Sequence, residues 1–293
     1  MSRYEQWDIV SGVGLTALAV AAARSIESHR ADGLVNDPYA ESFVVAAAPP
    51  VPMPTRPDAD VEQADLWARM AEHMGVRSRY FDDFFRTYCG DGARQAVILA
   101  AGLDTRAYRL DWPAGTRVFE LDQPRVLEFK DAVLRERGAR PHCDRRAVPV
   151  DLREEWAEPL RRAGFDPAVP TAWLAEGLMP YLPGPAQRDL MTTIASLSAP
   201  GSHAAVEFMH DLRAVFDDPA MTDLSRRFGI DMPALIPESA RDNDVAPDAW
   251  LPASWTADSD PAETVAGRYG RSFPGFTDTM PTGDYRFLIA HAG

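Results

Sequence analysis

The chain has 293 residues, a length that suits one large α/β domain with a cap or two small domains. Its 46% of hydrophobic residues is enough for a sizeable core and too little for a membrane protein. With 44 acidic and 30 basic residues, its formal net charge of -14 repels phosphate backbones and argues against a nucleic-acid substrate. Its two cysteines, Cys89 and Cys143, form no CxxC pair and no plausible set of metal ligands, so we expect no metal site and a reducing, cytoplasmic location.

The first 90 residues are predicted to form a helical cap. Asp37 can cap a short helix there, with Pro38 in its first turn, where a missing backbone N–H costs nothing. Residues 48–57 contain five prolines and are expected to form a loop. The expected helices cover residues 17–28, the short segment from Asp37, and residues 60–88, whose apolar side chains follow a helical period.

The apolar stretch 13–23 could suggest a signal peptide or a membrane span. The segment before it carries Glu5 and Asp8 and so lacks the positive charge that begins a signal peptide. Arg24 and Glu27 interrupt the stretch before it reaches the roughly 20 apolar residues that a span needs. We interpret it as an amphipathic helix and expect no membrane association.

From residue 95 onward, short apolar runs alternate with helical patterns. This alternation is typical of a parallel, doubly wound sheet. Because crossovers between parallel strands are right-handed, all strand C-termini meet at one edge, and ligands bind there near the point where strand order reverses. The expected strands cover residues 96–101, 116–121, 146–150, 171–175 and 203–208, and the helices between them include one from residue 123, one over 154–163 and one over 185–197.

Beyond residue 210 the pattern is weaker. Residues 229–250 are rich in Pro, Asp and Ala and are interpreted as a lid. The remaining predicted elements are a helix over 211–228, a short strand over 255–257, a helix over 261–269 and a strand over 285–290. We therefore expect a cap over residues 1–90 and an α/β domain over 91–293, with a mostly parallel seven-stranded sheet and an inserted lid near 211–250.

Charged residues and a glycine follow the predicted strands. A glycine after the first strand lets the backbone turn tightly and approach a ligand closely. Asp122, about 20 residues further on, can accept hydrogen bonds from both ribose hydroxyls of an adenosine cofactor. A structural role explains it too, since an acid beside Pro124 favours a helix start. In chain order, the residues at the strand ends are Gly102, Asp122, Asp151 and Glu176.

The same geometry would serve a nicotinamide dinucleotide, so the glycine pattern must decide. A pyrophosphate needs the N–H groups of a G-x-G-x-x-G loop. Here the three glycine positions hold Ala100, Gly102 and Thr105, and Asp104 projects into the loop where phosphate charge would lie. This pattern favours a ligand with a positive sulfonium and no phosphate, and an NAD(P)-dependent oxidoreductase is the alternative.

Eight short segments carry a more specific resemblance. They are GLTAL at 14–18, AAR at 22–24, DPYA at 37–40, RSRYFD at 77–82, AGLDTR at 101–106, FELDQP at 119–124, VDLR at 150–153 and EGLMPYL at 176–182. With them the chain resembles a largely actinobacterial family of S-adenosylmethionine-dependent methyltransferases related to leucine carboxyl methyltransferases. The resemblance implies the class I methyltransferase Rossmann-like fold and S-adenosylmethionine as cofactor. Residues 229–250 depart from the family pattern and plausibly shape the acceptor pocket.

The resemblance also implies roles for individual residues. Asp122 would bind the ribose, Asp151 would accept from the adenine amine, and Leu152 would pack on the ring. Gly102 would allow close backbone approach. Arg79 would pair bidentately with the methionine carboxylate, and Glu176 would bind the methionine amine. Three of them have an alternative role: Asp151 could cap the next helix, Arg79 could be a solvated helix residue, and Glu176 could be a general base.

Methyl transfer is an in-line displacement at carbon, so the enzyme mainly aligns the acceptor and excludes water. We expect a small-molecule acceptor and O-methylation of a hydroxyl or carboxyl group. A hydroxyl acceptor would need a base, for which Tyr181, His210 and Asp211 are candidates, although a structural role would explain each as well. A non-catalytic S-adenosylmethionine-binding protein and a methyltransferase acting on a protein C-terminus stay open as alternatives.

Overall fold

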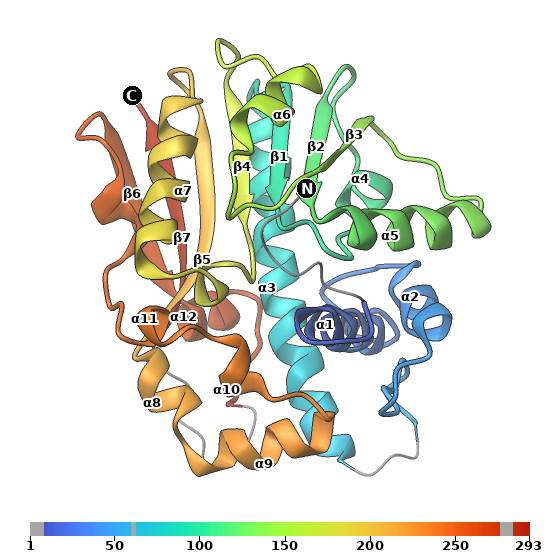
Figure 1. The fold of residues 1–293 in the computed structure, drawn as a ribbon. Coiled ribbons are helices and arrows are strands. Elements are labelled where there is room, and N and C mark those ends of the chain that lie inside the picture. Colours follow the sequence, from blue (N-terminus) through green and yellow to red (C-terminus); the bar gives the residue numbers. More distant parts are fainter. Residues whose placement is uncertain (1–8, 60–62, 276–283) are drawn as a thin grey trace.

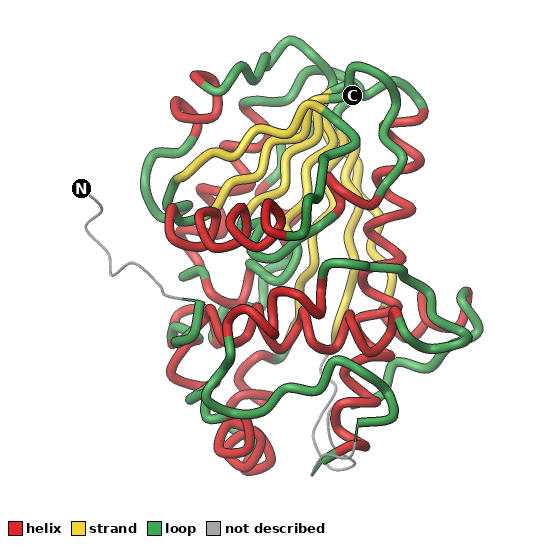
Figure 2. The backbone as a smooth tube through the Cα atoms, turned by 90° about the vertical axis from the view of Figure 1, so that its right-hand side faces the viewer, coloured by secondary structure: helices red, strands yellow, loops and turns green. Residues whose placement is uncertain are grey.

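The computed structural model describes residues 9–59, 63–275 and 284–293. They form a seven-stranded sheet of order β3-β2-β1-β4-β5-β7-β6, with helices on both faces (Figures 1 and 2). Strands β1 to β5 are parallel, and β7 is antiparallel to both of its neighbours. This confirms the predicted doubly wound, mostly parallel α/β sheet. The strands are β1 Gln95–Leu99, β2 Arg117–Asp122, β3 Asp144–Pro149, β4 Thr171–Ala175, β5 His203–His210, β6 Trp255–Pro261 and β7 Asp284–Ala292.

The helices fall into those before the sheet, those that follow single strands, and a group of short helices after β5. Before the sheet lie α1 Val13–Ser28, α2 Ala40–Ala47 and α3 Ala64–Gly90. Between the strands lie α4 Arg106–Arg109, α5 Pro124–Glu136, α6 Ala157–Arg162, η1 Met179–Tyr181, α7 Gly184–Ser196 and α12 Ala262–Arg268. After β5 come α8 Leu212–Phe216, α9 Pro219–Phe228, α10 Met232–Leu235, α11 Glu238–Arg241 and η2 Pro247–Trp250.

The core lies on both faces of the central strands. Because successive side chains of a strand point to opposite faces, β1 contributes to two separate apolar clusters. Ala96 and Ile98 pack into the cluster that includes α1 and α3, whereas Val97 and Leu99 pack into the cluster that includes α7. Burial on both faces explains why β1 has a continuous apolar sequence rather than an alternating one.

The N-terminal helices differ in detail from the prediction. The short helix begins at Ala40 rather than at Asp37, although the Asp37 carboxylate accepts from the backbone N–H groups of Tyr39 and Ala40, at 3.0 and 3.2 Å. The helix expected from residue 60 begins at Ala64, and residues 60–62 lie outside the described part of the chain. Asp37 thus acts as a cap for the turn that leads into α2.

The helix expected over 211–228 is two helices, α8 and α9. The break lies at Asp218, because the residue before a proline is disfavoured in the α conformation. The Asp218 side chain then caps α9 by accepting from the N–H of Ala220. The short helix α4 and the single turn η1 were not predicted, because neither is long enough to show a helical period.

The strand order reverses between β1 and β4, which are neighbours in the sheet. Figure 1 shows the C-terminal ends of the parallel strands facing α1, α2 and the α8–α11 segment, which gather below the sheet. Helix α3 extends from this group alongside the sheet and contacts β1, β4 and β5. Helix α3 thus packs both on α1 and on the sheet. The division into a cap over 1–90 and a domain over 91–293 therefore stays a prediction.

None of the helices in the described residues combines the length and the apolar character that crossing a bilayer requires.

Candidate functional site

A cavity of about 350 Å³ lies at the C-terminal edge of the sheet, between the strand ends and α1, α3 and residues 212–236. The structure brings most of the predicted site residues to its wall, and it leaves Arg79 and the candidate bases His210 and Asp211 outside. Those that line the cavity are Gly102, Asp122, Asp151, Leu152, Glu176 and Tyr181.

Asp122 ends β2, and its carboxylate is held by the backbone. One oxygen accepts from the N–H of Gly102 at 2.6 Å, and the other accepts from the N–H of Gln123 at 2.6 Å. Burial raises the pKa of Asp122 to about 6, while these two hydrogen bonds act in the opposite direction. A carboxylate offers about four lone-pair sites, so Asp122 keeps acceptor capacity for a ligand.

Gly102 supplies the turn that makes this contact possible. Its φ of 44° lies in the left-handed region, which a residue with a side chain rarely adopts. The preceding Ala101 donates its N–H to the carbonyl of Leu121 at 2.9 Å, which holds the loop against the end of β2. The loop therefore presents backbone, rather than side chains, beside the Asp122 carboxylate.

Asp151 follows β3 and forms a local pair with Arg153. Its oxygens accept from the Arg153 backbone N–H at 3.0 Å and from Arg153 Nε and Nη2 at 2.9 and 2.6 Å. Burial would raise the pKa of Asp151, but the hydrogen bonds and charge of Arg153 outweigh it and lower the pKa. Helix α6 begins only at Ala157, so Asp151 is not its cap. Leu152 lies beside it, half-buried in the cavity wall.

The prediction that Arg79 lies at the methionine carboxylate must be corrected. Arg79 donates to Asp83 at 2.8 Å and lies over the Tyr269 ring, with 39% of its side chain exposed. Arg77 of the same helix, in contrast, is buried and lines the cavity. Two residues of a helix are about 200° apart, so Arg77 and Arg79 point to opposite faces of α3. The apolar stripe through Met70 and Met74 could have identified Arg77, which follows at the same helical phase.

Arg77 lies between two carboxylates. Its Nε is 2.8 Å from Glu176 and 3.2 Å from Glu207. Glu207 on β5 was missed by the sequence analysis, although a lone acid in an otherwise apolar strand was a signal. It accepts short hydrogen bonds from the Gly177 N–H and the Tyr285 hydroxyl. Burial raises the pKa of Glu207, and Arg77 opposes this.

Gly177 permits this arrangement by its missing side chain. Its φ is 63°, and a Cβ built there would lie 2.6 Å from Arg77 Nη2. The guanidinium therefore packs directly against the backbone that follows β4. Any larger residue at position 177 would displace Arg77 from its position between Glu176 and Glu207.

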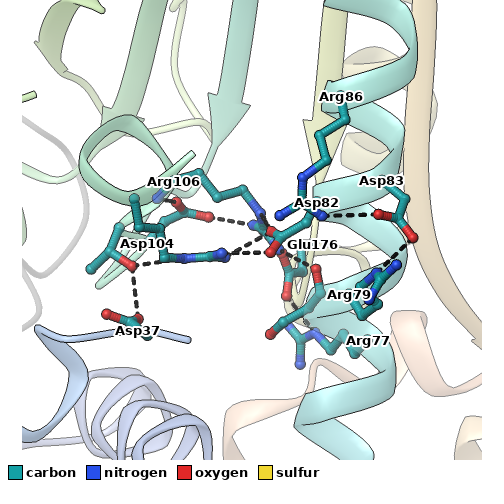
Figure 3. A network of polar contacts seen from close by, with 12 residues as sticks. Asp37, Arg77, Arg79, Asp82, Asp83, Arg86, Asp104, Arg106 and Glu176 are labelled. Carbon is teal, nitrogen blue, oxygen red and sulfur yellow. Dashed lines mark hydrogen bonds and ion pairs between the residues drawn. The ribbon is translucent and has the colours of Figure 1, made fainter. Parts of the chain in front are cut away.

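A buried network fixes Glu176 from its other side (Figure 3). Arg106 of α4 donates to Glu176 at 2.6 Å and to Asp82 of α3 at 2.7 Å, and it also pairs with Asp104. Asp82 in turn pairs with Arg109 at 2.5 Å. In Figure 3 the Arg77 side chain lies beside Glu176, whereas the Arg79 side chain points toward Asp83. The network connects α3, α4 and the end of β4, and so orients Glu176 toward the cavity.

The two catalytic candidates lie in different surroundings. The Tyr181 hydroxyl donates to Thr16 Oγ1 of α1 at 3.3 Å, and burial raises the pKa of Tyr181. His210 instead contacts Asp244 through Nδ1 at 2.7 Å, outside the cavity lining, and Asp211 beside it is also outside. His210 and Asp211 are therefore not placed to act as bases here.

The wall opposite the strand ends is apolar. Among the described residues, the side chains that segment 212–236 brings to the cavity are all hydrophobic, and α1 adds valines and alanines beside Thr16 and Arg24. We use the name apolar roof for the hydrophobic lining side chains of α1 and of segment 212–236, which include Val13, Val20, Val215, Met221, Leu224 and Ile236.

In the part of the chain that the structure describes, no three His, Cys, Asp or Glu side chains are grouped so as to hold a metal ion.

Comparisons with known proteins agree with this architecture. A family model described as leucine carboxyl methyltransferase matches residues 17–195. A Saccharopolyspora erythraea protein is 51% identical over 272 residues, covering 92% of this chain and 93% of its own. A Mycolicibacterium smegmatis protein is 44% identical over 297 residues, covering 98% and 97%. The names of both assign S-adenosyl-L-methionine-dependent methyltransferase activity by inference.

A solved structure supports the fold alone. A protein of family DUF574 from Streptomyces avermitilis superimposes with a TM-score of 0.53 at 13% sequence identity, covering 94% of this chain and 97% of its own. The identity is too low to transfer an activity or a ligand.

Proposed function

The chain belongs to the leucine carboxyl methyltransferase family and is an S-adenosylmethionine-dependent methyltransferase, and we propose that it methylates an oxygen atom of a small molecule enclosed below the sheet. The observation that carries the cofactor part of the proposal is the Asp122 carboxylate, fixed by two backbone N–H groups at the cavity wall. The family's name, which refers to a carboxyl acceptor, supports oxygen as the methylated atom.

The residues at the strand ends fit the polar groups of S-adenosylmethionine. Asp122 keeps lone pairs for the two ribose hydroxyls. Asp151 can accept from the adenine amine, beside the apolar face of Leu152. Gly102 presents backbone to the adenosine. The residues proposed to contact the sugar and the base include no cationic side chain, as expected for a cofactor without phosphate.

The methionine end of the cofactor would lie beside Glu176 and Arg77. We propose that Glu176 accepts from the ammonium group, since its pairs with Arg77 and Arg106 hold its side chain at the cavity wall. Arg77 would bind the carboxylate through the part of its guanidinium that faces the cavity. Because both side chains are held by the buried network, they need little rearrangement to bind a ligand.

Bound S-adenosylmethionine supplies an electrophilic methyl group on a cationic sulfur. The carboxylates of Asp122, Glu176 and Glu207 line the cavity and would favour a positive charge there. The apolar roof excludes water from the opposite side. Tyr181 and Thr16, whose hydroxyls lie 3.3 Å apart, can position the acceptor oxygen. The chain therefore contributes alignment and a dry, negatively charged surrounding.

Titration calorimetry with S-adenosylhomocysteine tests the proposal. Asp122→Ala removes two charge-assisted hydrogen bonds to the ribose, worth roughly 3 kcal/mol or more together, so we expect affinity to fall by at least about 100-fold. Asp144→Ala is the matched control, because Asp144 is exposed and pairs with Arg146 at the start of β3. Its affinity should stay within about twofold of wild type.

The same calorimetry addresses the oxidoreductase alternative. NADH should release no binding heat at concentrations where S-adenosylhomocysteine saturates the protein. Tight binding of NADH together with no binding of S-adenosylhomocysteine would refute the proposed function.

A further inference from the structure

The cavity has one polar wall and one apolar wall, and the apolar wall is large. The strand ends carry the polar groups proposed above for the cofactor. The apolar roof comes from segments that lie far apart in the sequence, α1 and residues 212–236, which Figure 1 shows together below the sheet. A bound acceptor must therefore bury a surface against hydrophobic side chains, which favours an apolar molecule.

Charges at the cavity disfavour an anionic acceptor. Three arginines are among the described lining residues, and each is already paired with a carboxylate. Arg24 pairs with Asp37 at 2.6 Å, Arg77 lies between Glu176 and Glu207, and Arg153 pairs with Asp151 at 2.6 Å. Only Arg77 is proposed to contact a ligand, namely the cofactor carboxylate. A second carboxylate under the roof would be desolvated without a cation of its own.

Neutral hydroxyl groups are available where the two walls meet. Tyr181 donates to Thr16 of α1, and both residues line the cavity. Burial raises the pKa of Tyr181, so its hydroxyl stays protonated at neutral pH. A neutral hydroxyl of a ligand can exchange hydrogen bonds with such groups, because each can donate and accept.

We propose that the acceptor is an uncharged molecule with an apolar body under the roof and a hydroxyl group, alcohol or phenol, near Tyr181 and Thr16. This inference rests on the proposed function, and it departs from the carboxyl acceptor that the family's name records. The acceptor oxygen attacks the methyl carbon, the carbon–sulfur bond breaks with its electron pair moving to sulfur, and the hydroxyl proton passes to a carboxylate of the cavity wall, for which Glu207, whose charge acts on Tyr181, is the candidate. The products are a methyl ether and the neutral thioether.

The test uses two matched series of probes, 4-alkylphenols and 4-alkylbenzoates with chains from ethyl to octyl. Calorimetry is run at pH 7 on the full chain saturated with S-adenosylhomocysteine, so that the readout is binding rather than activity. At this pH phenols are neutral and benzoates are ionised. Each added methylene should tighten phenol binding by up to about fourfold until the roof is filled. Benzoates should bind at least roughly tenfold more weakly at each chain length, because their charge is unpaired.

A matched pair of variants locates the binding surface. Val215→Ala removes two carbon atoms from the buried roof, so octylphenol should bind roughly fivefold more weakly. Val45→Ala makes the same change on α2, where the side chain is 70% exposed and outside the cavity, and it should leave octylphenol binding unchanged.

The outcomes separate this inference from the proposed function. If S-adenosylhomocysteine binds but phenol affinity does not rise with chain length, or if benzoates bind more tightly than phenols, the inference is overturned and the proposed function stands. Equal losses in the two valine variants would also overturn it. If S-adenosylhomocysteine itself does not bind, the proposed function fails, and the inference fails with it.

Discussion

The two walls of the cavity differ in how their side chains are held. At the strand ends, carboxylates are fixed by backbone N–H groups and buried arginines, as for Asp122 and Glu176. On the apolar roof, side chains are held only by packing, which is adaptable. This difference is the basis of our proposal that the sheet edge binds the cofactor through fixed geometry, whereas the helices outside it select the acceptor through shape and hydrophobicity. Changes to the first wall should therefore be costly, and changes to the second tolerated.

Within helix α3 the same contrast separates two arginines. Arg77 is buried between two acids, whereas Arg79 is partly exposed on the opposite face and pairs with Asp83. Arg77→Ala would leave Glu176 and Glu207 without their shared cation, so we expect the free energy of unfolding to fall by about 3–5 kcal/mol. Arg79→Ala should cost about 1 kcal/mol or less, as is typical of an exposed pair.

Urea denaturation followed by circular dichroism measures both variants. Equal losses of stability would show that Arg77 is not the buried ion-pair centre that the structure describes.

A substitution at Gly177, which lies against Arg77, should destabilise the protein less than Arg77→Ala does. Gly177→Ala adds a left-handed strain and a Cβ at 2.6 Å from Arg77 Nη2. Gly138→Ala is the matched control, because its φ of 64° is nearly the same and no atom would lie within 4 Å of its Cβ. The strain should cost about 1–3 kcal/mol in each variant. The clash should make Gly177→Ala clearly the less stable of the two and weaken its binding of S-adenosylhomocysteine, whereas indistinguishable unfolding curves would argue against a tight Gly177–Arg77 contact.

The smallest expected effect on the strand-end wall comes from pH. Burial raises the pKa of Asp122 to about 6, and only its ionised form can accept from both ribose hydroxyls. Affinity for S-adenosylhomocysteine should therefore be nearly complete at pH 7 and fall by roughly tenfold by pH 5, as the carboxylate takes up a proton. Calorimetry across this range checks the sign and the midpoint. In Asp122→Asn the fall should be lost; a wild-type affinity that rises as pH falls would contradict this role of Asp122.

The strand-end wall could be predicted from the sequence because the sequence signals of its residues are local. A parallel strand buried on both faces is a continuous apolar run, and the residue after it necessarily lies at the ligand edge. This placed Gly102, Asp122, Asp151 and Glu176 together. That these four contact the cofactor stays a prediction.

Arg79 and Glu207 show where this reasoning ends. Choosing between two arginines two residues apart requires the helical phase of α3, which the motif at 77–82 does not contain and only the apolar stripe through Met70 and Met74 indicates. The environment of Glu207 depends on Gly177 and Tyr285, which the chain brings in from other strands. The apolar roof is harder still, because α1 and residues 212–236 meet only in the folded protein. Non-local contacts of this kind leave no periodic signal in the sequence.

A crystal structure of the protein with S-adenosylhomocysteine tests the central claim most directly. We predict both ribose hydroxyls within hydrogen-bond distance of the Asp122 carboxylate, the adenine amine beside Asp151, and the sulfur directed toward the apolar roof. A ligand bound with its ribose away from Asp122, or outside the cavity at the strand ends, would contradict this account.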